Sequence, residues 1–501
     1  MKKLLIILTL TLLTSVWLSA DWEQAYKALA DDGVAGDNFG VSVSISGDYA
    51  IVGAVHDNDN GYRSGSAYIF YRNDGTWAQQ AKLTADDGAA YDEFGCSVSI
   101  SGDYAIVGAF FDDDNGDYSG SAYIFYRNGT VWTQQAKLTA DDGAEGDYFG
   151  MSVSISDDYV IVGARGDDDN GNDSGSVYIF FRTGAVWTQQ AELTADDGAT
   201  DDFFGNSVSI SGDYAVVGAW GDDDNGYSTG SAYMFHRSGT VWTQQAKLTA
   251  DDGAAWDRFG ISVSISGDYT IVGAWGDDEY TGSAYMFHRS GTVWTQQAKL
   301  TADDGAAWDR FGISVSISGD YTIVGAWGDD EYTGSAYMFH RSGTTWTQQA
   351  QLTADDGAED DEFGFPVSIS GDYAIVGAYG DDDNGEDSGS AYMFEYSDVA
   401  IDEDLSPEPM GTALQAAFPN PFNPSATVAY SLAEEATVRL SVYNLRGRRV
   451  QVLDEGLRSA GEHRVVWDGL DTQGEQAGSG VYLFRLETGG EVHLRKGILM
   501  K

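Results

Sequence analysis

Cysteine, proline and basic residues are scarce in this chain. Cys96 is the only cysteine among 501 residues, so packing rather than disulfide bonds must hold the fold together. Only six prolines accompany 63 glycines, a balance that suits short strands joined by tight turns. Lys and Arg number 27 against 79 Asp and Glu, and the net charge of −52 argues against binding to nucleic acid or anionic membranes.

Long apolar runs are also missing, apart from one at the N-terminus. Residues 1–20 have the pattern of a secretory signal peptide: Lys2 and Lys3, an apolar stretch over 4–13, and the small residue Ala20. The stretch is short for a membrane span and none follows it, so we expect no transmembrane span in the mature chain. A retained N-terminal anchor is the alternative.

A repeated unit occupies most of the sequence. Its Phe-Gly pair begins at residues 39, 94, 149, 204, 259, 311 and 363, with a spacing of 55 residues four times and then 52 twice. Each copy contains four short runs rich in Val, Ile, Tyr and Phe, as at 97–101, 104–109, 121–126 and 131–138. Four strands in a unit of this length predict the blade of a β-propeller.

The two ends of the repeat array predict a closed ring. The last copy lacks its fourth strand, whereas residues 21–27 (DWEQAYK) resemble that strand (VWTQQAK). We therefore expect an all-β fold in which residues 21–397 form a seven-bladed β-propeller closed by the N-terminal strand. Closure removes both exposed sheet edges. An open solenoid is the alternative, but it would need capping repeats.

The motifs FG, IVGA and GSAYIF, repeated seven times, resemble the FG-GAP repeat of the integrin α-subunit propeller and its bacterial relatives. The resemblance extends from Trp22 to about Ser397 and implies the same ring. The residue after Gly-Ala departs from the integrin pattern, because it is never Pro. The calcium loop of integrins, D-x-D-x-D-G-x-x-D between the first two strands, is here only Ser-Gly-Asp-Tyr, as at 101–104. That calcium site is therefore not implied for this chain.

The carboxylates are expected on one face of the ring. Strand direction alternates within a blade, so the loop between the second and third strands emerges beside the connector between blades. Calcium takes six to eight oxygen ligands, often from clustered carboxylates, and would be the cofactor of such loops. The candidate metal ligands are Asp112, Asp113, Asp114, Asp167, Asp168, Asp169, Asp222, Asp223, Asp224, Asp381, Asp382 and Asp383. The alternative is turn formation and solubility, since Asp, Asn and Gly favour turns and the register does not match an EF-hand.

Three tryptophans that follow Gly-Ala are expected near the same face. Trp220, Trp275 and Trp327 are candidate binding residues, because exposed aromatic rings stack on sugars or anchor protein partners. Packing between blades explains them equally well.

No catalytic constellation is present in the sequence. Catalysis needs unlike groups around one reacting atom, whereas nearly every polar residue here is repeated. We find no zinc-ligand spacing, no G-x-S-x-G and no Gly-rich phosphate loop. We therefore predict no catalytic residues and a protein that is not an enzyme. A propeller enzyme acting on polysaccharide is the less favoured alternative.

The C-terminal part forms a different module. Residues 398–417 are acidic and then contain proline, as in a linker. Alternating runs at 427–432, 438–443, 448–453, 463–467, 480–486 and 492–499 predict a small immunoglobulin-like β-sandwich over residues 418–501. The motifs PNPFNP, VYNLRGRRV, AGEHRVVWDG and GSGVYLFRL resemble the C-terminal sorting domain of type IX secretion cargo. The resemblance implies that the outer-membrane secretion machinery is a partner; a plain sandwich is the alternative.

The whole sequence predicts a binding protein that is secreted or held on the outer surface of a Gram-negative-type bacterium. Its acidic propeller face would adhere to a protein or glycan ligand at the cell exterior. A structural surface-layer component is the alternative function.

Overall fold

The computed structural model describes two units of the chain. Its described residues are 21–397 and, in the C-terminal part, 413–414, 425–433, 436–444, 448–459, 461–472, 476–488 and 491–499. The predicted signal peptide and nearly all of the predicted linker lie outside these residues. The chain divides into Met1–Ala400 and Ile401–Lys501. No helix within the described residues is long and apolar enough to cross a membrane.

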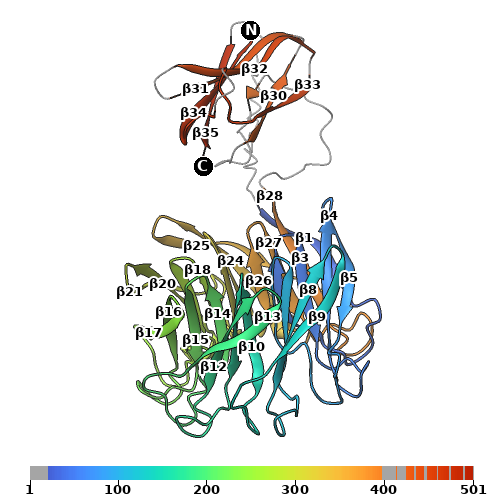
Figure 1. Cartoon of the computed structure of the whole chain (residues 1–501), viewed down its shortest axis with the longest axis vertical. Helices are drawn as coiled ribbons and strands as arrows, with labels where there is room; N and C mark the ends of the chain where they lie inside the picture. Colours follow the sequence, from blue (N-terminus) through green and yellow to red (C-terminus); the bar gives the residue numbers. More distant parts are fainter. Residues whose placement is uncertain are drawn as a thin grey trace, which may run out of the picture. The chain divides into compact units, whose positions relative to one another are not determined.

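Each repeat forms one four-stranded antiparallel sheet, as the strand pattern predicts (Figure 1). The first blade consists of β2 (Phe39–Ser46), β3 (Tyr49–Ala54), β4 (Ser66–Asn73) and β5 (Thr76–Leu83), paired in chain order. The next five blades have the same order: β6 (Val98–Ser101), β7 (Tyr104–Ala109), β8 (Ser121–Asn128) and β9 (Val131–Leu138); β10 (Phe149–Ser156), β11 (Tyr159–Ala164), β12 (Ser176–Thr183) and β13 (Val186–Leu193); β14 (Ser207–Ser211), β15 (Tyr214–Ala219), β16 (Ser231–Ser238) and β17 (Val241–Leu248); β18 (Val263–Ser266), β19 (Tyr269–Ala274), β20 (Ser283–Ser290) and β21 (Val293–Leu300); β22 (Ser314–Ser318), β23 (Tyr321–Ala326), β24 (Ser335–Ser342) and β25 (Thr345–Leu352). The shorter loops of the fifth and sixth blades contain the single turns α1 (Asp277–Tyr280) and α2 (Asp329–Tyr332), in which the second and third residues have positive φ angles.

The seventh blade is built from both ends of the propeller. It contains β26 (Val367–Ser370), β27 (Tyr373–Ala378) and β28 (Ser390–Ser397), and its outer strand is β1 (Asp21–Ala28). β1 pairs antiparallel with β28, with Trp22 opposite Tyr396. The predicted closure of a seven-bladed ring by the N-terminal strand is therefore confirmed.

The apolar core lies between blades rather than within one central mass. β3 and β4 are buried along most of their length, because neighbouring blades cover both of their faces. Ile51 and Ile69 of the first blade pack with Phe94 and Val107 of the second. Seven such clusters follow one another around the ring, and the cluster that joins the last blade to the first completes the circle.

The glycine of the repeated Gly-Ala pair permits close approach of adjacent blades. A Cβ atom on Gly53 would lie 2.0 Å from the carbonyl oxygen of Gly95 in the next blade. The Ser42 hydroxyl donates to the same oxygen at 2.6 Å. Equivalent serines line a central channel of about 450 Å³ together with a ring of valines, so these hydroxyls join blades instead of facing the channel freely.

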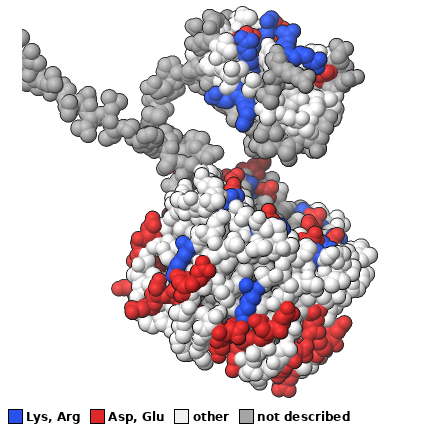
Figure 2. Space-filling view, turned by 90° about the vertical axis from the view of Figure 1, so that its left-hand side faces the viewer, with Lys and Arg blue, Asp and Glu red and all other residues white. Residues whose placement is uncertain are grey.

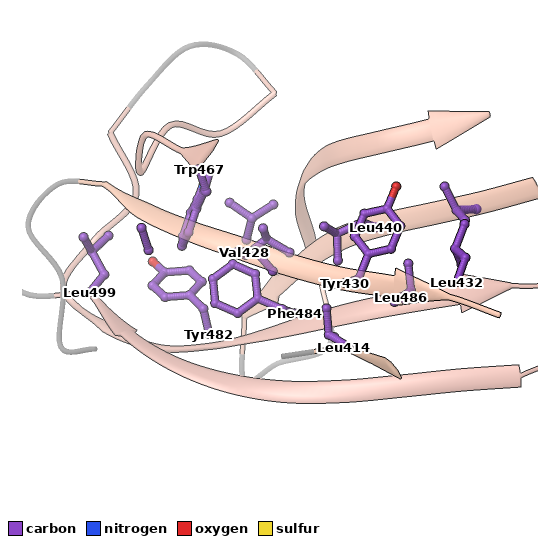
Figure 3. Packing of buried hydrophobic residues seen from close by; sticks show 14 residues of the cluster. Leu414, Val428, Tyr430, Leu432, Leu440, Trp467, Tyr482, Phe484, Leu486 and Leu499 are labelled. Atoms are coloured by element: carbon purple, nitrogen blue, oxygen red, sulfur yellow. The ribbon is translucent and has the colours of Figure 1, made fainter. Parts of the chain in front are cut away.

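The C-terminal unit is a small β-sandwich, as predicted from the alternating runs. One sheet has the order β29 (Ala413–Leu414), β30 (Ala426–Leu432) and β33 (Gly461–Trp467). The other has the order β32 (Arg449–Arg458), β31 (Ala436–Asn444), β34 (Gly480–Thr488) and β35 (Glu491–Leu499). Trp467, Tyr482 and Phe484 pack together in the core between these strands (Figure 3).

Removal of the Trp22 side chain should open the ring selectively. Trp22 is 6% exposed and packs on Tyr396 and on Tyr321 of the neighbouring blade. Truncation of a buried tryptophan costs about 3–5 kcal/mol, so urea denaturation of W22A should show at least this loss of unfolding free energy. Trp132 holds the equivalent place in the second blade, where a hairpin keeps its strand in position. W132A is the control, and a loss for W22A that is smaller than for W132A would contradict a closing role for β1.

Candidate functional site

The connectors between blades and the loops after each second strand form one continuous surface. The amide of Phe94 donates to the carbonyl of Ser64, and the amides of Phe149 and Phe39 donate to Ser119 and Ser388, so each connector lies against the preceding blade's loop. We call this surface the acidic face. Of the 64 Asp and Glu residues in 21–397, 27 lie in the connectors and 24 in the loops. In Figure 2 a large group of acidic side chains lies at the lower edge of the propeller, and further groups lie on its side.

A buried cluster of carboxylates, a tyrosine and a lysine supports this face in most blades. In the second blade, Asp112 is buried and accepts a hydrogen bond of 2.7 Å from the Tyr123 hydroxyl. Lys137 Nζ lies 2.9 Å from Asp112, 2.8 Å from Asp87 and 2.5 Å from Asp114. Burial alone would lower the pKa of Lys137, but these hydrogen bonds raise it. The ammonium group therefore stays charged and joins a connector, a loop and a strand.

Five blades contain this ammonium group, which we call the lysine site. Each lysine lies near the start of the connector and contacts a buried Asp, an exposed Asp of the loop and an Asp of the preceding connector. The lysines are Lys82, Lys137, Lys247, Lys299 and Lys27.

The third and sixth blades depart from this arrangement. Gln351 replaces the lysine in the sixth blade and donates hydrogen bonds to Asp329 and to the Tyr337 hydroxyl. Glu192 replaces it in the third blade, where carboxylate oxygens of Asp142, Asp169 and Glu192 lie within 4.8 Å of one another. Burial and the neighbouring Asp169 and Asp142 raise the pKa of Glu192 to about 8. This blade has the carboxylates of the lysine site and an additional carboxylate in place of the cation.

The predicted metal ligands divide into three structural classes. The first Asp of each run (Asp112, Asp167, Asp222 and Asp381) is buried, and its carboxylate accepts the amide two residues later. The second (Asp113, Asp168, Asp223 and Asp382) accepts the amide five residues later. The third contacts a lysine at Asp114, Asp224 and Asp383, but joins the Glu192 cluster at Asp169. The first and second carboxylates of each run thus stabilise the loop by accepting its backbone amides.

The three predicted tryptophans are brought together in one row. Arg258 stacks between Trp220 and Trp275, with its guanidinium carbon 5.2 and 4.5 Å from the ring centres. Arg310 lies 5.4 Å from Trp275 and 4.1 Å from Trp327. The rings are half-buried, so this cation–π row joins the fourth, fifth and sixth blades.

The exposed aromatic residues of the acidic face were not predicted. Tyr62, Tyr91, Tyr118, Tyr227, Trp256 and Trp308 are the exposed large aromatic side chains of residues 21–397. For three of them the sequence does contain a signal, which is variation at one position of the repeat. The residue directly before the Asp of Asp-x-Phe-Gly is aromatic at 91, 256 and 308, but Gly or Asp in the other copies. Their exposure depends on loop geometry that repeat spacing does not reveal.

Comparison with known proteins gives a family-model match for each unit. A family model described as FG-GAP repeat matches residues 22–70, 77–125, 132–180, 187–235, 242–287, 294–339 and 346–394. A model described as FlgD Ig-like domain matches residues 423–491. Human integrin alpha-X and integrin alpha-D are each 27% identical over 128 residues, which cover 22% of this chain and 11% of the relative. The chain thus matches about a tenth of the length of these curated relatives.

The Glu192 cluster should make stability depend on pH. The folded-state pKa of Glu192, about 8, lies above its ordinary value of 4.5. The stabilisation from its proton is therefore complete below pH 4.5 and lost as pH rises through 8. Glu192→Gln removes this loss, so the melting temperature of the variant relative to wild type should increase between pH 5 and pH 9. A difference that stays constant over this range would contradict the assignment.

Proposed function

The chain belongs to the FG-GAP repeat family, and on that premise we propose that it is a binding and adhesion protein that acts outside the cell through its acidic face. One observation carries the proposal: the same face concentrates 51 of the 64 propeller carboxylates and all six exposed aromatic residues. Exposed aromatic rings on a rigid scaffold suit ligand contact. The integrin-like repeats support a binding role as well.

The parts of this face have different proposed roles. The row of Trp220, Trp275 and Trp327 stiffens one side of the face, because arginine side chains fill the spaces between its rings. The ligand is a protein or glycan of the cell exterior, and a nucleic acid is disfavoured by the negative charge. The repeated polar groups support no catalytic role.

Among the predicted calcium sites, the third blade fits best. A lysine ammonium group already contacts two carboxylates in each of the loops at 112–114, 222–224 and 381–383. Asp142, Asp169 and Glu192 offer only oxygen atoms at the point where five other blades place a cation. We therefore restrict the calcium proposal to these three residues, with a bound Ca²⁺ taking the place of the ammonium group.

Export is proposed from the two ends of the sequence. Residues 1–20 would direct passage across the inner membrane, and residues 418–501 would engage the outer-membrane secretion machinery. The resulting location is the exterior or outer surface of a Gram-negative-type bacterium. A structural surface-layer component is the second candidate, and it is supported by the many near-identical blades.

Oriented attachment tests the proposed function with a panel of candidate ligands. Thr130, in the turn of the second blade between β8 and β9, and Thr200, in a connector of the acidic face, are both exposed. The full chain carrying Cys96→Ser with either Thr130→Cys or Thr200→Cys is fixed to a biosensor through the new thiol. Members of a panel of extracellular proteins and polysaccharides should bind the first surface and give at least tenfold less signal on the second. Equal signals, or no binding to either, would refute the proposal.

Calcium should stabilise the wild-type chain but not the variant Glu192→Lys. The variant introduces the ammonium group found in five other blades and so removes the proposed site. Titration calorimetry and thermal melting at millimolar calcium measure the effect, and at 100 times Kd the stabilisation is about 2.7 kcal/mol. An equal shift of both melting temperatures, or no binding heat for wild type, would refute the proposed calcium site.

A further inference from the structure

The exposed aromatic residues of the acidic face form pairs at the boundaries between blades. The ring centres of Tyr62 and Tyr91 lie 5.4 Å apart, and those of Tyr227 and Trp256 lie 4.4 Å apart. Two further pairs are stacked: Tyr280 with Trp308 at 4.6 Å, and Tyr118 with Tyr148 at 6.2 Å. We call these four pairs the aromatic platforms. Each contains at least one ring that is about half exposed, between 48 and 58%.

The propeller backbone holds each platform in place. One residue of every pair comes from a loop and the other from the connector that follows it. The Tyr91 amide donates to the Tyr62 carbonyl at 2.8 Å, and the Trp256 amide donates to the Tyr227 carbonyl at 2.9 Å. In the other two platforms an amide-to-carbonyl bond also joins the pair, from Trp308 to Tyr280 at 3.2 Å and, two residues further along its connector, from Tyr148 to Tyr118 at 3.0 Å. The platforms are thus rigid and repeated around the ring.

Six of the eight platform residues have a positive φ angle, a backbone conformation that disfavours large side chains; in Tyr118, Tyr148 and Tyr280 the angles are +61°, +57° and +67°. Tyr91, Trp256 and Trp308 have φ angles of +75°, +76° and +82°. The equivalent positions in the other blades are Gly36, Gly146, Asp201 and Asp360. A non-glycine residue in this region costs roughly 1–2 kcal/mol, and these rings recover little of it by burial. Neither local conformation nor the core explains the aromatic rings, which points to a contact with an external molecule.

A cleft of about 410 Å³ adjoins the platforms of the first and second blades. Tyr91, Phe111 and Tyr118 supply aromatic rings, while Arg63, Glu93 and Asp117 supply hydrogen-bonding groups. The volume falls in the range of small-ligand pockets. Flat rings flanked by carboxylates and a guanidinium match a sugar, whose C–H faces lie on aromatic rings while its hydroxyls donate and accept hydrogen bonds.

The arrangement of the platforms favours a polymeric ligand without negative charge. A protein partner is usually anchored by one contiguous, desolvated centre, whereas these platforms are separate and lie among carboxylates. The propeller carries 15 basic and 64 acidic residues, a charge of −49, which repels an anionic polymer. Repeated subsites gain affinity when one chain occupies several of them.

We propose that the aromatic platforms bind a neutral or amino polysaccharide, with Tyr91, Trp256 and Trp308 as stacking residues. This inference rests on the proposed function and names the ligand class of the same face. A neutral chain would bind through stacking and hydroxyl hydrogen bonds. An amino polysaccharide would add charge attraction, which salt screens.

The test compares the full-length chain with two triple variants. Y91G/W256G/W308G introduces the glycine found at Gly36 and Gly146, so it should remove stacking while relieving backbone strain. V131A/V241A/V293A removes three exposed valines at the starts of fourth strands, away from the acidic face. Affinity for a soluble β-glucan, chitosan oligosaccharides and alginate is measured by calorimetry at low and high salt, and stability by thermal melting.

The glycine variant should bind the β-glucan or chitosan at least tenfold more weakly than wild type, with a melting temperature that is unchanged or higher. The valine variant should bind as wild type does, and alginate should not bind. Salt-sensitive binding of chitosan alone would assign the amino polymer. Unchanged affinity of the glycine variant would overturn the inference. Binding of proteins but of no polysaccharide on the oriented biosensor would overturn it while leaving the proposed function intact; binding of nothing would refute both.

Discussion

The pairing of β1 with β28 is the constraint on which the propeller depends. Every other blade is a continuous meander whose hairpins keep its strands adjacent, whereas the seventh blade joins two distant parts of the chain through hydrogen bonds and side-chain packing. With this pairing, Phe39 and Val52 of the first blade pack with Ile375 and Met393 of the last, and no blade retains an open edge. Because the ring closes, seven connectors and seven loops are held on a common face.

Lysine ammonium groups within that face reduce the electrostatic repulsion among its many carboxylates. A lysine ammonium at each of five blades contacts carboxylates of the loop and of the preceding connector, and the nearby tyrosine hydroxyl donates to the most buried one. The third blade is an exception to this arrangement. Glu192 stands in place of the lysine, while the Asp residues that would contact the lysine are retained. Divergence among repeats of one chain thus changes the local cluster of charges without any change of fold. The aromatic platforms arise in the same way, from single residues that vary in an otherwise repeated loop.

The fold was largely predictable from the sequence because it depends on periodic features. Strand positions, the missing fourth strand of the seventh blade and the shared acidic face all follow from spacing and from alternation of strand direction. The lysine site was not predicted, because Asp87, Asp112 and Lys137 are separated by about 25 residues each and meet only in the folded blade. The sequence also could not distinguish the exposed tryptophans from the half-buried ones. Trp275 follows Gly-Ala and is half-buried against arginines, whereas Trp256 lies in a left-handed connector turn and is 48% exposed.

Cross-linking of β1 to β28 tests ring closure most directly. Glu23 and Glu395 are opposite each other in this strand pair, a separation compatible with a disulfide bond. In the full-length chain with Cys96→Ser, the variant E23C/E395C should form an intramolecular disulfide under mild oxidation, seen as faster migration on a non-reducing gel and as protection of both thiols from alkylation. Two thiols that stay reactive, or that form only intermolecular bonds, would show that the ring is not closed by the N-terminal strand.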